Sequence, residues 1–496
     1  MRQTILLLMI VFVVRYADAQ QWLIEYPYHD NEDVVFTIGD MSGKYNYSFG
    51  YRYDKVEDIM YPHALCVDQE GNYISKDIEY EGVKGAFNSA LGMSDNNVFV
   101  TAYCTDYEAT DTYEKMWVAV VDPDLNILYE SYVSIEDPYV SFGHTAYSVV
   151  NDDNKFVVLT KVAKNVAEEI MLDCDFVFYE FDEQCNLLYN KYLENTSYNS
   201  EISDFVFIPY RNCYAIFGRA MNVTGVNSVI YVDEEFTYLS CLPIDNLNNY
   251  PNYIRPYFVS VGHCYEDNTI LMSMQTRNTS SLAEYCPLVL RVDIDMNIVD
   301  SIMFERKDIT DYVSQYNSIA YVNPNTIYVS TFEVGDMYNL ESNTSIVYVI
   351  NDNLDLLGSK KFCLGYFMNI LYVQPTQDGG CIVQAYYEKD SDKVAYICKL
   401  SAGDFDVAVE EYKDKVAIES YPNPVSSILN INVGEIKGDD IMITIYDISG
   451  RRCMDYTVMI EDKIISIDLS LFKSGMYYYS ITDDYGNVVI DKFVKK

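Results

Sequence analysis

The chain has 496 residues, a formal net charge of −41 and a hydrophobic content of 49%. So acidic a surface repels phosphate backbones, which argues against nucleic acid as a partner. The high and evenly spread hydrophobic content excludes a disordered acidic chain, and the length predicts two or more domains unless the larger one is a closed repeat architecture.

Residues 1–19 have the parts of a secretory signal peptide. Arg2 gives a positive start, Ile5 to Val14 form an apolar run, and Ala17-Asp18-Ala19 is a small-x-small cleavage site. The apolar run is too short to cross a bilayer, which takes about 20 residues. We therefore expect an exported mature chain that begins near Gln20, with an uncleaved N-terminal anchor as the alternative.

A repeated pattern fills residues 21–412, where an apolar strand, an Asp- or Asn-initiated turn and a second apolar strand recur every fifty to sixty residues. The leading Asp or Asn can bond its own turn backbone, and the Asn four places on tolerates a left-handed conformation. Two further strands precede most of these hairpins. The turns begin at Asp68, Asp122, Asp182, Asp233, Asp293 and Asn351, with a degraded seventh copy near residues 400–404.

Units of four short strands at this period predict the blades of a β-propeller. The hairpins indicate about seven blades, with six or eight left open because the first and last copies are irregular. A closed ring would remove exposed sheet edges. In the last unit, Pro375 to Val383 reads PTQDGGCIV and Ala395 to Leu400 reads AYICKL. This resembles the T-x-DGG and K-L blades of secreted propellers, a resemblance that supports the fold and implies no activity.

A different strand rhythm begins after Lys415, where the acidity also falls. About seven strands predict a small immunoglobulin-like β-sandwich over residues 416–496, separated from the propeller by the linker Glu410–Lys415. In order, the chain shows a YPNPV opening at residue 421, an IYDxxGR turn at residue 445, an L-x-x-x-G-x-Y strand at residue 471 and a KFVKK end.

Together these four pieces resemble the C-terminal sorting domain of the type IX secretion system across its full length. The resemblance implies passage to the periplasm, recognition by the outer-membrane translocon and removal of the domain by a sortase. It further implies a final location at the cell surface or in the medium, with attachment to surface lipopolysaccharide as one way of anchoring.

No motif identifies a metal site. The triplets Asp122-x-Asp124-x-Asn126 and Asp293-x-Asp295-x-Asn297 open like a calcium-binding EF-hand loop. They lack the Gly at the sixth place and the Glu at the twelfth, where Val133 and Phe304 cannot ligate calcium. A hairpin turn therefore explains them better, and we expect no metal or other cofactor.

No motif identifies a catalytic site either. The four histidines, His29, His63, His144 and His263, lie in separate units with no Ser or Cys in a nucleophile motif. A Ser-His-Asp site could still be assembled in space, and a glycosidase-type pair stays open among so many carboxylates.

The twelve cysteines show no C-x-x-C spacing that would indicate zinc or redox chemistry. Several lie within apolar strand patterns, where a cysteine behaves as a small buried hydrophobe. We expect this of Cys66, Cys213 and Cys398.

The sequence favours a noncatalytic propeller that binds an extracellular ligand or has a structural role. The alternative is an extracellular hydrolase acting on glycan or peptide, with its site on the face that carries the longer loops. Loops on a rigid scaffold are where function usually lies. These loops are Cys104–Met116, Lys161–Asp175 and Thr276–Cys286.

Overall fold

The computed structural model divides the chain into two compact units, Met1–Phe405 and Asp406–Lys496. It describes residues 22–26, 31–79, 87–104, 115–164, 175–193, 200–220, 226–244, 253–278, 285–304, 311–314, 316–333, 345–362, 368–389, 392–407, 419–433, 440–447, 452–459, 464–470, 472–483 and 488–496. The predicted signal peptide lies outside these residues, as do parts of the three long loops.

Antiparallel sheets build the first unit, and seven of them are described. Consecutive strands pair in order within most sheets, so each is an up-and-down meander. The first sheet consists of β2 (Glu32–Ser42), β3 (Tyr45–Asp54), β4 (Ile59–Val67) and β5 (Tyr73–Asp77). The second consists of β6 (Phe87–Gly92), β7 (Val98–Cys104), β8 (Lys115–Val121) and β9 (Ile127–Ser134). The third consists of β10 (Ser141–Val150), β11 (Phe156–Ala163), β12 (Asp175–Phe181) and β13 (Leu187–Leu193).

The next sheets continue this plan, with a short 3-10 helix at Pro209–Arg211 between the first two strands of the fourth. They are β14 (Ser200–Ile208), β15 (Cys213–Ala220), β16 (Val226–Asp233) and β17 (Tyr238–Pro243); β18 (Tyr253–Cys264), β19 (Thr269–Asn278), β20 (Tyr285–Asp293) and β21 (Ile298–Met303); and β22 (Asp311–Val313), β23 (Ile319–Asn323), β24 (Thr326–Glu333), β25 (Ser345–Ile350), β26 (Leu356–Phe362) and β30 (Asp406–Val407).

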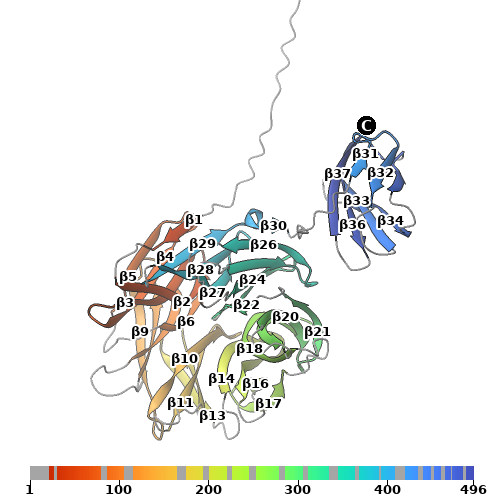
Figure 1. Ribbon diagram of the computed structural model, residues 1–496. Coiled ribbons are helices and arrows are strands. Elements are labelled where there is room, and N and C mark those ends of the chain that lie inside the picture. The colour runs from red at the N-terminus through yellow and green to blue at the C-terminus, as the bar shows by residue number, and fades with distance from the viewer. Residues whose placement is uncertain are drawn as a thin grey trace, which may run out of the picture. The chain divides into compact units, whose positions relative to one another are not determined.

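The sheets are arranged as a closed ring around a common centre (Figure 1). The last sheet has the order β1-β29-β28-β27, formed by β1 (Trp22–Glu25), β29 (Asp392–Leu400), β28 (Cys381–Lys389) and β27 (Met368–Pro375). Each innermost strand contacts the next in the order β2, β6, β10, β14, β18, β23 and β27, and β27 contacts β2 again. This is the β-propeller that the repeat predicts.

Strand burial follows from this packing of sheets against sheets. The middle strands are covered on both faces, so β7 (VFVTAYC) is buried at every position and reads as a nearly continuous apolar run. The outermost strands face solvent, and half of the residues of β9 are exposed. Apolar clusters shared by neighbouring sheets therefore form the core of the propeller.

The predicted seventh hairpin near residues 400–404 is wrong. After β29 ends at Leu400, the chain forms a short 3-10 helix at Ala402–Asp404 and continues into β30, which joins the preceding sheet. The outer partner of β29 is instead β1 from the start of the chain, with Leu23 opposite Cys398 and Ile24 opposite Ile397. The first and last strands of the repeat thus belong to one sheet. In this sheet β1 covers the edge of β29, which a C-terminal hairpin would otherwise have to cover.

The predicted conformation of the outer turns also needs correction. The left-handed residue is the one three places after the leading Asp, and not the Asn four places on. In the second sheet this is Leu125, with a φ of 59°. Asn126 instead donates its backbone N–H to Asp122 Oδ1 at 2.7 Å and its amide to Asp122 Oδ2 at 3.1 Å. The equivalent left-handed residues are Gly71, Cys185, Phe236, Met296 and Leu354.

Burial explains why apolar residues occupy this strained position. Leu125 is 1% exposed and packs in the cluster between the first and second sheets, with Phe49 and Trp117. The strain of a positive φ is therefore offset by the apolar area that the turn inserts between the blades.

Replacing Leu125 by Ala should lower the free energy of unfolding by about 3 kcal/mol, because a buried Leu is removed and a cavity is left. The backbone at residue 125 is equally strained with Leu and with Ala, so this strain does not contribute to the difference in stability between the two proteins. Leu128 on the same hairpin is 45% exposed and provides the matched control. Denaturant unfolding should show little change for Leu128→Ala; equal losses in the two variants would contradict this role of the turn.

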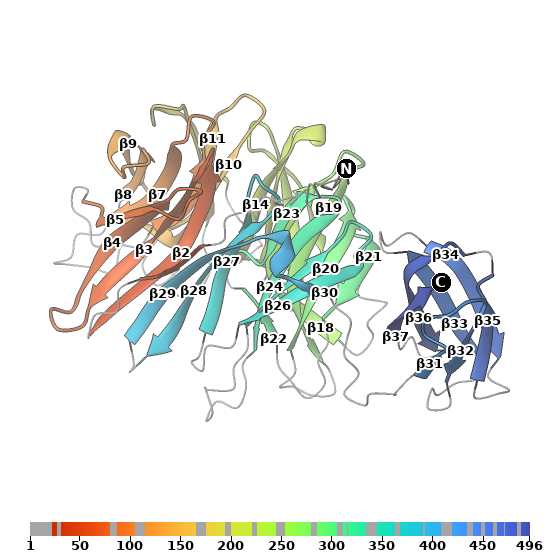
Figure 2. The same ribbon diagram turned by 90° about the horizontal axis from the view of Figure 1, so that it is seen from above.

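The second unit consists of two packed sheets (Figure 2). One has the order β31-β32-β35 and the other β34-β33-β36-β37. Buried residues of both sheets, among them Leu429, Ile445 and Phe493, form one apolar core. The strands are β31 (Glu419–Tyr421), β32 (Ile428–Asn432), β33 (Asp440–Asp447), β34 (Arg452–Met459), β35 (Ile464–Asp468), β36 (Gly475–Asp483) and β37 (Val488–Lys495). A small β-sandwich is therefore correct, and its immunoglobulin-like character stays a prediction.

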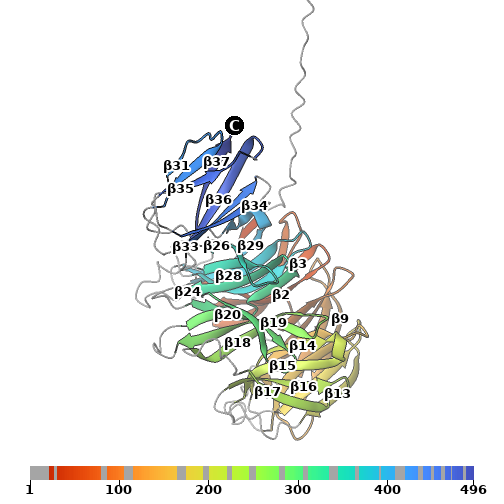
Figure 3. The same ribbon diagram turned by 90° about the vertical axis from the view of Figure 1, so that its right-hand side faces the viewer.

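The YPNPV opening lies against the C-terminal end of the chain, beside β37 (Figure 3). Asn423 accepts the backbone N–H of Val494 at 2.9 Å and donates its amide to the carbonyl of Lys492 at 3.1 Å. Val425 donates its N–H to the carbonyl of Val494 at 2.7 Å. Two motif pieces at opposite ends of the domain are thus parts of one contact. Most of the IYDxxGR turn lies outside the described residues.

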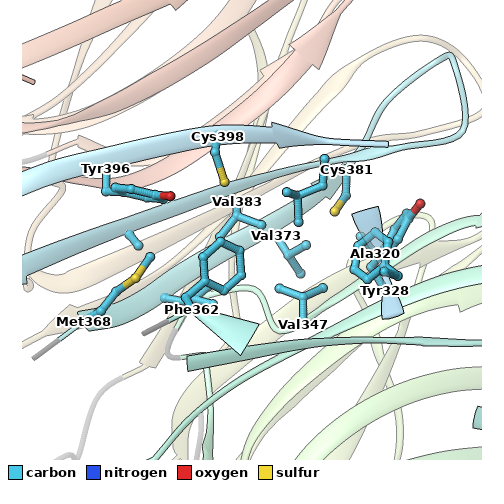
Figure 4. Close-up of a cluster of buried hydrophobic side chains, with 14 of the residues drawn as sticks. Ala320, Tyr328, Val347, Phe362, Met368, Val373, Cys381, Val383, Tyr396 and Cys398 are labelled. Atoms are coloured by element: carbon cyan, nitrogen blue, oxygen red, sulfur yellow. The ribbon is translucent and has the colours of Figure 1, made fainter. Parts of the chain in front are cut away.

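The cysteines predicted to be buried are buried. Cys66, Cys213 and Cys398 are each at most 4% exposed. Cys398 packs with Cys381 and Tyr396 in the apolar cluster between the last two sheets, as Figure 4 shows. Burial raises the pKa of the Cys66 and Cys398 thiols to about 12, so both remain protonated and unreactive at neutral pH.

Candidate functional site

A pocket lies between the first and the last sheets of the propeller, which are side by side in Figures 1 and 2. Its cavity volume is about 20 Å³, room for about one water molecule. The turns β2–β3, β4–β5 and β27–β28 contribute to its wall, so it opens at the end of the ring that carries the short turns. It is lined by Trp22, Met41, Lys44, Asn46, Val67, Asp68, Gln69, Thr376, Gln377, Asp378, Ile382 and Lys399.

The closing strand β1 brings Trp22 to this pocket. Trp22 packs against the β4–β5 turn at Gly71, whose φ is 86°. A Cβ atom on Gly71 would lie 2.8 Å from both Cβ and Cγ of Trp22, which no side chain tolerates without a shift. Gly71 is therefore required both by its backbone conformation and by the close approach of Trp22.

An ion pair between a buried lysine and an exposed aspartate forms one wall of the pocket. Lys399 is 7% exposed, and its Nζ lies 2.5 Å from Asp378 Oδ2, while the Thr376 hydroxyl donates to Asp378 Oδ1 at 2.5 Å. Burial raises the pKa of Asp378, but the bonds from Lys399 and Thr376 outweigh it and hold that pKa below its usual value. The T-x-DGG and K-L motif thus links the β27–β28 turn to β29.

Buried polar groups without partners gather at this junction. Asn46 is 1% exposed and Trp22 is half-buried, yet neither Asn46 Nδ2 nor Trp22 Nε1 has a hydrogen-bond partner in the described part of the chain. Gln374 and Gln384 are at most 1% exposed and lack partners for both amide atoms. Register places the two glutamines with Ile382 on the face of the last sheet that meets the first sheet.

Nearly all buried polar groups in proteins have a hydrogen-bond partner, so each exception calls for an explanation. Six of the ten unpartnered buried side-chain atoms in the described residues belong to these four residues at one sheet junction. Two of these atoms, Asn46 Nδ2 and Trp22 Nε1, belong to residues that line the pocket, whereas Gln374 and Gln384 do not line it.

Two carboxylates near the centre of the ring join neighbouring inner strands. Asp40 on β2 accepts the N–H of Gly92 at 2.8 Å, and Asp204 on β14 accepts the N–H of Val261 at 2.6 Å. Burial raises the pKa of Asp40 to about 6 and that of Asp204 to about 7, although each carboxylate accepts two backbone N–H bonds. Each bond connects one sheet to the next, so these groups stabilise the ring.

Asp204 should make the propeller less stable as the pH rises from about 4 to 7. A carboxyl whose pKa is higher in the folded than in the unfolded chain binds more protons when folded, so its contribution is present below the unfolded pKa of about 3.9 and is lost as the pH passes the folded pKa. The variant Asp204→Asn does not titrate and should weaken this dependence. Thermal unfolding of both proteins from pH 4 to 8 would measure it; parallel curves would contradict the assignment.

His63 takes part in a chain of hydrogen bonds at the end of β1. Its Nδ1 lies 2.7 Å from Asp77 Oδ1 and its Nε2 lies 2.8 Å from the Tyr26 hydroxyl, and Arg52 contacts Asp77 at 2.7 Å. Burial raises the pKa of Tyr26, so the phenol is protonated at neutral pH and is not an activated nucleophile. The chain therefore anchors β1 to the first sheet.

The other residues considered from the sequence are dispersed. His263 stacks on Tyr321 with ring centroids 3.9 Å apart, while His29 lies outside the described residues. The Asp293 carboxylate bonds its own turn at Asp295 and Asn297, as Asp122 does in its turn. Within the described ranges, no three His, Cys, Asp or Glu side chains gather as metal ligands.

Comparison with a protein-family model decides the nature of the C-terminal unit, because residues 419–496 match the secretion system C-terminal sorting domain. The C-terminal part of the chain is a type IX sorting domain. A protein that carries it is exported to the cell surface or secreted. No helix among the described residues is long and apolar enough to cross a membrane.

Solved structures similar to the chain are β-propellers. A lectin from Burkholderia pseudomallei is 11% identical, with 75% of this chain and 98% of that chain covered and a TM-score of 0.50. The β-propeller domain of the Trilobed protease from Pyrococcus furiosus is 10% identical, with 76% and 97% covered and a TM-score of 0.40. A Penicillium chrysogenum α-L-arabinanase is 7% identical, with 64% and 93% covered and a TM-score of 0.39. These likenesses concern the fold alone.

A search of curated protein sequences found no match. The sequence motif at residues 375–383 and 395–400 contains part of the pocket wall, including Asp378 and Lys399, but no sequence signal marks Trp22 or Asn46 as members of a site. Asn46 lies in a strand pattern like many others, and only the rarity of Trp, with two in the chain, could have drawn attention to Trp22.

Proposed function

We propose that the chain is an exported, noncatalytic β-propeller that binds a small polar extracellular ligand in the pocket between its first and last sheets. The observation that carries this proposal is the pair of unpartnered N–H donors, Asn46 Nδ2 and Trp22 Nε1, on the pocket wall. Both atoms are buried from solvent, so a ligand would reach them only after these side chains turn toward the pocket. Its acceptors would then satisfy groups that are costly to leave unpaired.

The pocket wall supports binding more directly than it supports chemistry. Lys399 and Asp378 neutralise one another, and Asp68 accepts bonds from its own turn at Glu70 and Asn72. Neither carboxylate is therefore poised as a general base, which would need a raised pKa near 7. The pKa of Asp68 is in fact held below its usual value: burial raises it, but the bonds from Asn72 and Glu70 outweigh that effect.

The sorting domain at residues 419–496 implies that the chain interacts with the type IX secretion machinery, which would export the propeller. We further propose that the translocon recognises the domain, that a sortase removes it and that surface lipopolysaccharide is the point of attachment. Detection of lipopolysaccharide on the mature protein would test the last step.

Array screening tests the proposed function. The mature full chain should bind members of a glycan or peptide array, and hydrolase substrates should show no turnover. The variant Asn46→Leu should lose binding, because it keeps the volume but removes the buried donor. Asn353, which is exposed on the turn of another sheet, provides the control Asn353→Leu.

Turnover of a glycan or peptide substrate would overturn the proposal in favour of the hydrolase alternative. Binding that survives in Asn46→Leu would move the site elsewhere on the propeller. The long loops of that alternative fall largely outside the described residues, and their function is open to the same screen.

A further inference from the structure

We propose that the outer rim of the first four sheets is a docking surface for a basic, amphipathic polypeptide segment. This surface lies on the periphery of the ring, where Figure 1 shows β5, β9, β13 and β17. None of its residues lines the pocket, so the proposal does not depend on the proposed function. The residues are large, apolar and between 42% and 54% exposed, and we call them the apolar rim: Tyr73, Ile74, Leu128, Tyr129, Leu187, Leu188, Tyr189, Tyr238 and Leu239.

The apolar rim follows a position that the repeat keeps apolar. In all six sheets with an Asp- or Asn-initiated turn, the second residue of the strand after the turn is an exposed branched aliphatic residue. These residues are Ile74, Leu128, Leu188, Leu239, Val299 and Leu357. Single exposed apolar residues are ordinary in proteins, whereas a run of them over neighbouring elements marks an interaction surface. The run ends in the fifth sheet, where Asp300 follows Val299.

Contacts between neighbouring sheets make the rim continuous. The Cys185 thiol, in the turn of the third sheet, lies 3.9 Å from the carbonyl oxygen of Tyr129 on β9. Lys191 Nζ on β13 donates to the carbonyl of Glu235, in the turn of the fourth sheet, at 2.7 Å. An outer strand thus touches the turn of the next sheet, and a partner can contact strands of several sheets at once.

The turns between these strands supply negative charge. Asp124, Glu183 and Glu235 are exposed there, one in each of the second, third and fourth sheets. The leading Asp of each of these turns accepts a backbone N–H of its own turn. Together these carboxylates outnumber the two lysines of the rim strands, Lys76 and Lys191. Exposed apolar side chains therefore alternate with carboxylates along the rim.

A basic amphipathic segment complements both features of the rim. Its apolar side chains would cover the exposed leucines and tyrosines, and its cations would face the carboxylates of the turns. A second copy of this chain is a poorer partner, because two chains with a net charge of −41 repel each other. A membrane surface of anionic lipids is repelled for the same reason. Apolar contact and opposite charge together therefore favour a basic polypeptide.

Peptide binding to the mature full chain tests the proposal. The probe is a fluorescein-labelled helical peptide of about 18 residues, with leucines on one face and lysines on the other. One comparison peptide has glutamates in place of the lysines, and another has serines in place of the leucines. Fluorescence anisotropy should give a micromolar dissociation constant for the leucine–lysine peptide, and the affinity should fall as salt is added. The serine peptide should bind at least about tenfold more weakly, and the glutamate peptide should not bind.

A triple variant locates the docking surface. Leu128→Ser, Leu188→Ser and Leu239→Ser together should weaken binding of the leucine–lysine peptide at least about tenfold, because three apolar contacts are lost. Each of these side chains is exposed, so the midpoint of thermal unfolding should change little. A loss of affinity in a normally folded variant therefore reports on docking.

Exposed positions outside the rim provide matched controls. The triple variant Leu23→Ser, Val299→Ser and Leu357→Ser makes the same change in the other three sheets, and the affinity should change less than about twofold. Asp124→Asn should weaken binding about twofold and reduce its salt dependence. Asp295→Asn, at the same place in the turn of the fifth sheet, should do neither.

Equal losses in the two triple variants, or equal binding of the serine and leucine peptides, would contradict the apolar rim as a docking surface. Absence of binding by the leucine–lysine peptide would overturn the proposal. Sedimentation of the mature chain as a dimer that the rim variant abolishes would assign the surface to a second copy instead. The pocket variant Asn46→Leu should leave peptide binding unchanged, so this proposal and the proposed function can fail separately.

Discussion

A chain that ends at Asp414 should accumulate in the periplasm as a folded propeller and be absent from the cell surface and the medium. The deletion of residues 415–496 removes the sorting domain and leaves every strand of the propeller, including β30 at Asp406–Val407. The predicted signal peptide should still direct export across the inner membrane, but the translocon that we propose to recognise the sorting domain would have no such domain to bind. Fractionation of the native host with an antibody to the propeller would measure the distribution.

Protease resistance of the trapped chain is the control for folding, because a domain with its own core survives removal of its neighbour. The reciprocal control joins residues 415–496 to an unrelated periplasmic protein, which should then appear at the surface. Truncated protein at the surface in normal amounts would contradict the role of the sorting domain in this chain.

The closing strand β1 should be critical for the stability of the propeller. Ile24 is 5% exposed and packs between the first and last sheets with Phe36 and Ile397. The variant Ile24→Asp loses this apolar burial and places a carboxylate in an apolar cluster, so the free energy of unfolding should fall by about 4 kcal/mol or more. Denaturant unfolding of the mature full chain would measure the loss.

Leu23 on the same strand provides a matched control, because neighbouring side chains of a strand point to opposite faces. It is 53% exposed, so Leu23→Asp should change stability by no more than about 0.5 kcal/mol. Similar losses in both variants would show that β1 contributes through its backbone alone, and unchanged stability in both would contradict closure of the ring by this strand.

The two variants also separate closure from ligand binding. Trp22 lies at the start of β1 and lines the pocket, so release of this strand should abolish binding together with stability. Leu23→Asp should leave both intact. A propeller that unfolds more easily yet binds its ligand normally would show that the pocket does not depend on β1.

The repeat and the sorting domain could be read from local patterns. Alternation and Asp-initiated turns at a regular period determine a stack of antiparallel sheets, because each four-stranded unit must cover its apolar faces with its neighbours. The motif pieces between Tyr421 and Lys496 likewise suffice to identify the domain, because each is a short run of neighbouring residues and the four follow one another in a fixed order.

Long-range contacts decided the remaining features. The strand that completes the last sheet comes from residues 22–25, about 375 positions from its partner β29, and no local pattern marks it as a missing partner. The left-handed residue in the outer turns is apolar because the adjacent sheet buries it, as it buries Leu125. Turn propensities alone favour Asn at such a position, so they pointed to the wrong residue.

The pocket is likewise a feature that long-range contacts decide. Trp22, Asn46 and Lys399 come from three distant segments, and each taken alone has an ordinary reading as a strand residue. Sequence by itself determined where this protein is sent and which kind of scaffold it builds, because signals and repeats are encoded by neighbouring residues. Tertiary structure alone decided where unpaired polar groups lie together, because closure of the ring brings together the first and last sheets and buries their polar groups at one junction.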